Sequence, residues 1–86
     1  MQHVDGNALA GLLAEIFPFD LTEAVGRCAH CGSTGMIGDT MVYFASPGIV
    51  VRCPSCDGVL ATLVETGSRI WLSLSGVTGL TVARSA

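Results

Sequence analysis

Hydrophobic residues near the N-terminus recur with the spacing of an amphipathic α-helix. The apolar stripe follows the pattern i, i+3, i+4, i+7, i+8 and comprises Leu9, Leu12, Leu13, Ile16 and Phe17. Asp5 or Asn7 can cap the first turn, and Pro18 ends the helix. The pattern therefore predicts a helix over residues 6–17, preceded by a loose segment at residues 1–5.

In the second half of the chain the helical spacing gives way to short β-rich runs separated by turn residues. The predicted strands are 40–44, 49–51, 59–64, 69–74 and 80–82. Ser46-Pro47-Gly48 suits a type II turn between the first two strands, and another turn is expected at residues 76–79. On the strand 69–74, Trp71 lies on the face opposite to the apolar one.

A short helical turn is predicted at Asp20-Leu21-Thr22-Glu23, which has the Asp-x-x-Glu form of a capping box. A catalytic role for these acids is the alternative, but capping accounts for both of them. A helix followed by antiparallel hairpins places the chain in the α+β class.

All four cysteines lie in two Cys-x-x-Cys pairs, Cys28/Cys31 and Cys53/Cys56, separated by 21 residues. This arrangement is typical of a four-thiolate metal site, because two intervening residues let a tight turn aim both sulfurs at one point. Four sulfurs at about 2.3 Å complete the tetrahedron of a zinc ion and leave no open position. The sequence therefore predicts one structural zinc with these four cysteines as its ligands.

Residues around the cysteines fit the same interpretation. Gly32 follows the first pair where a left-handed backbone is expected, and Asp57-Gly58 occupies the matching place in the second. Arg27 and Arg52 directly precede the leading cysteines, where they either offset the charge of the thiolates or are solvated. His30 is expected to be exposed rather than a ligand, since four cysteines already fill the tetrahedron.

The composition limits both the size and the partners of the protein. With 86 residues the chain forms one domain, residues 1–86, for which a metal is a large part of the stability. The net charge is −3 and lysine is absent, so the basic face that nucleic-acid binding needs is missing. Hydrophobic residues make up 50% and charged residues only 13% of the chain, which indicates apolar surface left for a protein interface.

The predicted interface has Trp71 at its centre, because aromatic side chains are the usual anchors of such surfaces. The small-residue face of the helix, at Ala8, Gly11 and Ala14, contributes to the same apolar excess. A symmetric homodimer is the simplest way to cover the surface, and a different protein partner is the alternative.

Several function classes lack their sequence signals. There is no nucleophile elbow, no nucleotide-binding glycine loop and no small-molecule site to be read, so we expect a protein without enzymatic activity. The absence of a signal sequence argues against a secreted protein with two disulfides. The apolar tail at residues 70–83 is too short for a membrane span, so we expect a cytoplasmic protein.

The two cysteine turns with a hairpin between them resemble zinc-ribbon domains over residues 27–66. A wider pattern is similar to a family of small actinobacterial zinc-ribbon proteins of unknown function; it comprises Asp20-Leu-Thr-Glu-Ala, Cys28-x-x-Cys-Gly, Val42-Tyr43, Val51-Arg-Cys-Pro-x-Cys-Asp, Trp71-Leu and Ser75-Gly76-Val77. The expected architecture is the helix at 6–17 followed by a zinc-ribbon β-sheet over 27–86. The resemblance implies no activity or partner.

Two further interpretations of the cysteines stay open. Cys28-Ala-His-Cys-Gly and Cys53-Pro-Ser-Cys also resemble the metal loops of rubredoxins, which hold an iron that transfers electrons. Against this resemblance, aromatic residues are few and the N-terminal helix has no counterpart. Release of zinc on thiol oxidation, as in a redox sensor, is the other interpretation.

Overall fold

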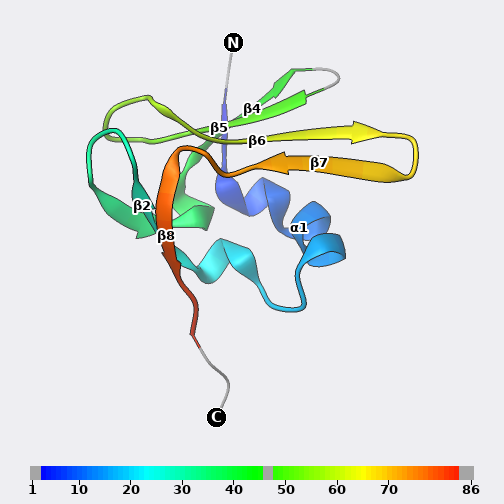
Figure 1. Cartoon of the computed structure of the whole chain (residues 1–86), viewed down its shortest axis with the longest axis horizontal. Coiled ribbons are helices and arrows are strands. Elements are labelled where there is room, and N and C mark those ends of the chain that lie inside the picture. The colour runs from blue at the N-terminus through cyan, green and yellow to red at the C-terminus, as the bar shows by residue number, and fades with distance from the viewer. Residues whose placement is uncertain (1–2, 46–47, 84–86) are drawn as a thin grey trace.

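The computed structural model describes residues 3–45 and 48–83, and within them the chain forms one short α-helix and two antiparallel β-sheets (Figure 1). In chain order the elements are β1 (Val4–Asp5), the 3₁₀ helix η1 (Gly6–Leu9), α1 (Ala10–Ile16), η2 (Leu21–Glu23), β2 (Val25–Cys28), β3 (Thr34–Met36), η3 (Ile37–Asp39), β4 (Met41–Ala45), β5 (Gly48–Arg52), β6 (Val59–Thr66), β7 (Arg69–Ser73) and β8 (Val77–Thr81). This arrangement confirms the α+β class.

The predicted N-terminal helix is present, although its first turn is a 3₁₀ helix. The Asp5 carboxylate accepts a hydrogen bond from the Asn7 N–H at 3.1 Å and so caps this turn. Leu9 and Leu13 are buried in the core, and the helix ends before Pro18. The prediction of a loose start is wrong for Val4–Asp5, because β1 pairs with β4, a tertiary contact that two residues cannot signal by their pattern.

The larger sheet has the strand order β1-β4-β5-β6-β7 and contains the predicted hairpins. The Ser46-Pro47 part of the predicted type II turn lies outside the described residues. One face of the sheet carries Val42, Val51 and Leu63, which are buried against the leucines of η1 and α1. Figure 1 shows the helical segments on this side of β5 and β6.

The smaller sheet has the order β3-β2-β8 and runs across the direction of β6 and β7 in Figure 1. Neither β2 nor β3 follows from the sequence pattern, because both are short and contain a glycine in place of an alternating apolar residue. Pairing with β2 also makes Val77–Gly79 part of β8, so the turn predicted there is wrong for these residues. The strands expected as one region at 27–86 therefore divide into two sheets.

Gly76 lies where the chain crosses from the larger sheet to the smaller one. Its N–H donates to the Leu60 carbonyl at 3.0 Å, and its own carbonyl accepts from the Ala29 N–H at 2.8 Å. A Cβ atom at this position would lie 1.9 Å from the Val59 carbonyl oxygen. Only glycine lets the backbone approach β6 this closely, and the first cysteine turn is thereby attached to the larger sheet.

Candidate metal centre

The two cysteine pairs lie in turns that belong to different sheets. Cys28 is the last residue of β2, whereas Cys53 directly follows β5. The turns bring all four predicted cysteines together as free thiols, with their Sγ atoms within 4.8 Å of one another. The cluster therefore combines side chains from turns next to the smaller sheet and next to the larger one.

The sulfur positions fit a tetrahedral metal site. The Sγ atoms of Cys28 and Cys56 are 3.7 Å apart, and those of Cys31 and Cys53 are 3.8 Å apart. Four sulfurs at about 2.3 Å from one ion form a tetrahedron with edges of about 3.8 Å. The cluster could hold a metal ion, and thiolate ligands of this kind suit zinc as well as iron.

The two turns have the same backbone hydrogen-bond pattern. The Gly32 N–H donates to the Cys28 carbonyl at 2.9 Å, and the Asp57 N–H donates to the Cys53 carbonyl at 2.8 Å. Gly32 and Asp57 both have positive φ, as the sequence predicted for Gly32.

The same turns direct backbone N–H groups at the sulfur atoms. The N–H groups donate from His30 to Cys28 at 3.3 Å, from Ser55 to Cys53 at 3.4 Å and from Gly58 to Cys56 at 3.4 Å. Each turn is thus preorganised to hold ionised sulfurs.

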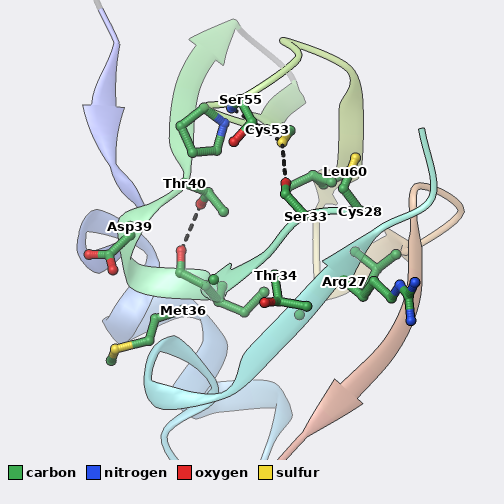
Figure 2. Close-up of a pocket in the computed structure, with 15 residues that line it drawn as sticks. Arg27, Cys28, Ser33, Thr34, Met36, Asp39, Thr40, Cys53, Ser55 and Leu60 are labelled. Carbon is green, nitrogen blue, oxygen red and sulfur yellow. Dashed lines mark hydrogen bonds between the residues drawn. The ribbon is translucent and has the colours of Figure 1, made fainter. Parts of the chain in front are cut away.

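Ser33 is a site residue that the sequence reasoning missed. Its hydroxyl lies 3.1 Å from the Cys31 sulfur and 3.6 Å from the Cys53 sulfur, so it contacts both turns. Figure 2 shows the contact with Cys53. The Ser33 hydroxyl and N–H lower the pKa of the Cys31 thiol. Burial opposes ionisation of Cys53, but hydrogen bonds from the Ser33 hydroxyl and the Ser55 N–H help lower the pKa of its thiol to about 6. The only sequence signal was its position two residues after Cys31.

Cys56 shows the opposite electrostatic behaviour. The Gly58 N–H favours its thiolate, but desolvation and the three neighbouring cysteines together raise the pKa of its thiol to about 12. The physical reason is that four sulfurs this close repel one another when all are negative. A divalent cation removes that repulsion, and four thiolates around it leave a formal charge of −2.

The two arginines beside the cysteines have different surroundings. Arg52 donates to the Asp57 carbonyl at 2.8 Å, and its guanidinium lies 5.9 Å from the centre of the Tyr43 ring. It therefore stabilises the second turn through the backbone rather than through a sulfur. The Arg27 side chain is exposed and has no hydrogen bond within the part of the chain that the structure describes.

His30 lies outside the sulfur cluster and is exposed, as expected from the sequence. Its Nε2 atom is 3.1 Å from the Val59 carbonyl oxygen at the start of β6. This contact adds another link between the first turn and the larger sheet.

A small cavity of about 60 Å³ lies beside the two buried cysteines, Cys28 and Cys53. Ile37, Leu60 and Val77 contribute to its walls, with Ser33 at the side of the sulfurs. In Figure 2 the charged ends of Arg27 and Asp39 point away from it. The cavity can hold a few water molecules and is smaller than the pockets that bind organic ligands, which are roughly 300 Å³ or more.

Fold and site together define a small α+β protein with a four-cysteine cluster. The chain belongs to DUF6510, a family of unknown function, whose family model matches residues 1–85. Comparisons with curated proteins and with solved structures gave no match. Among the described residues, no helix is long and apolar enough to cross a membrane.

Proposed function

We propose that the protein is a cytoplasmic zinc-binding module of the zinc-ribbon type, without enzymatic activity, that acts by binding another protein or a second copy of itself. The observation that carries the metal assignment is the cluster of four Sγ atoms within 4.8 Å, contributed by turns from both sheets. Zinc held by four cysteines has no open position for substrate or water. Its role here is structural, because it fastens the smaller sheet to the larger one.

Zinc is favoured over iron by the surroundings of the sulfurs. The described residues that line the cavity beside Cys28 and Cys53 include no aromatic side chain. Trp71 is on the exposed side of β7, and Phe17 pairs with Phe19 beyond the end of α1. An aromatic enclosure of the kind expected around a rubredoxin iron is thus missing from the cavity side of the site.

Metal analysis of the purified protein tests this assignment. We expect one zinc per chain, measured by inductively coupled plasma mass spectrometry, and a colourless solution. Cys53→Ser should abolish stoichiometric zinc, whereas Ser55→Ala, which keeps the backbone N–H that points at Cys53, should retain it. Stoichiometric iron with a visible absorption band would replace the proposal with the electron-transfer alternative.

A further inference from the structure

Strand β7 leaves one side of its backbone without a partner among the described strands, because it is last in the order β1-β4-β5-β6-β7. The β6–β7 hairpin closes with the pair Thr66 and Arg69. Hydrogen-bonded and non-hydrogen-bonded pairs alternate along antiparallel strands. Arg69 and Trp71 therefore bond to β6, while Ile70 and Leu72 direct their N–H and C=O groups to the free side.

This edge lacks the protection that natural sheets usually give to a free strand. Short length, proline, bulges and lysine are the usual devices. The opposite edge, β1, is only two residues long, whereas β7 has five residues, no proline and an uninterrupted register with β6. Arg69 is the one charged side chain on β7, and Trp71 is 59% exposed. The edge is therefore suited to pair with another strand.

We propose that β7 pairs antiparallel with β7 of a second copy, about a two-fold axis at Trp71, to form one continuous sheet. The inference rests on the interaction role proposed above and names the surface and its partner. In this register Ile70 faces Leu72 of the second copy, and each such pair exchanges both of its N–H···O bonds. The two Trp71 side chains meet across the axis on the outer face of the sheet.

Charge and side-chain chemistry favour a second copy over other occupants. Arg69 faces Ser73 of the second copy and lies diagonally next to its Trp71, where a cation–π contact forms. No like charges meet in this register, so the segment Arg69–Ser73 is complementary to itself. A nucleic acid is disfavoured by the net charge of −3.

Sedimentation of the metal-loaded protein between about 1 and about 100 µM tests the pairing, since specific interfaces of modest size dissociate in this range. The wild type should dimerise, with a blue shift of the emission of Trp71, the only tryptophan in the chain. Trp71→Lys should weaken the dimer about a hundredfold, because like charges then face each other across the axis and lie next to Arg69. Trp71→Glu should weaken it less, because Arg69 of the second copy lies diagonally next to the new carboxylate. An equimolar mixture of the two variants should restore it as a heterodimer.

Phe44→Lys is the matched control, because Phe44 is 53% exposed on β4, which two strands separate from β7. It should leave the dissociation constant unchanged. Amide hydrogen exchange gives the geometric test: the Ile70 and Leu72 amides should be protected in the wild-type dimer and exchange rapidly in Trp71→Lys. A wild type that stays monomeric at about 100 µM, or a dimer in which these two amides exchange freely, would overturn the pairing. Metal content measured on the same sample tests the proposed metal role separately.

Discussion

Gly32 and Asp57 occupy equivalent positions in the two cysteine turns, with φ angles of 76° and 62°. Each lies four residues after the leading cysteine and donates its N–H to that cysteine's carbonyl. A left-handed conformation costs an L-residue about 1–2 kcal/mol, although Asp tolerates it better than most. The second turn therefore carries strain that glycine avoids in the first.

This difference predicts effects of different size on the free energy of unfolding when the two positions are substituted. Gly32→Val should lower the free energy of unfolding by about 1–2 kcal/mol, because a β-branched residue is forced into the left-handed region. Asp57→Gly should change it by less than about 0.5 kcal/mol, since relief of strain offsets the entropy that glycine adds to the unfolded chain. Urea denaturation of the metal-loaded proteins measures both. A marked loss for Asp57→Gly would mean that the Asp57 carboxylate matters more than its backbone.

Removing the Ser33 hydroxyl should weaken metal binding. It lies within hydrogen-bonding distance of the Cys31 sulfur, and residues that support metal ligands in this way typically change affinity by about 10- to 100-fold. We expect Ser33→Ala to lose about tenfold in a competition titration against a chelator, at the lower end of that range, and Ser33→Thr to retain most of the affinity. Ser55→Ala is the control, because Ser55 contacts Cys53 through its backbone N–H. Equal affinities of Ser33→Ala and the wild type would refute the role of the hydroxyl.

Metal affinity should fall as the pH falls, because thiolates bind the metal and thiols do not. The pKa of the Cys56 thiol, raised to about 12, keeps it protonated in the metal-free protein at neutral pH, so the metal must displace at least this proton. The pKa of the Cys53 thiol is lowered to about 6, so the proton of this thiol joins the competition with the metal below that pH. Affinity should drop about tenfold per pH unit per displaced proton, with a steeper slope below about pH 6. Calorimetry in buffers of different ionisation enthalpy counts the protons, and a count of zero at pH 7 would contradict the prediction.

Gly76 should tolerate no side chain. A Cβ there would meet the Val59 carbonyl at 1.9 Å, and such overpacking costs typically about 1–3 kcal/mol or more. Gly76→Ala should therefore lower the free energy of unfolding by at least about 2 kcal/mol. Gly79→Ala on β8 is the matched control, since its Cβ would meet nothing within 4 Å. Similar stabilities of the two variants in urea would contradict the crowding at the crossing between the sheets.

The cysteine cluster could be predicted from sequence because its spacing is a local property of two turns. The N-terminal helix could be predicted because its apolar residues recur at the helical period. The strands β4 to β7 could be predicted because they are β-rich runs bounded by turn residues. Ser33 could not, because it contacts Cys53 only after the two turns have come together. The same holds for β1 and β2, whose pairing depends on partners distant in the chain.

The division of the strands into two sheets could not be predicted from the sequence pattern either. It depends on Gly76, where the close approach to β6 is a tertiary contact, while the sequence offers only a glycine typical of a turn. A turn was predicted at residues 76–79 because a glycine needed for a close tertiary contact looks the same in the sequence as a glycine in a turn. Zinc identity and the partner stay predictions, because sulfur geometry suits more than one metal.

The proposed role of the metal is to hold the two sheets together in one fold. Structural zinc contributes roughly 10–16 kcal/mol in small zinc-binding peptides, which is as large as the whole stability of a typical domain of about 5–15 kcal/mol. The most direct test is the ¹H–¹⁵N amide spectrum of the wild type before and after the metal is removed by a chelator. We predict that removal collapses the amide dispersion of residues in both sheets and that added zinc restores it. A metal-free protein that keeps its dispersed spectrum would contradict the structural role of the metal.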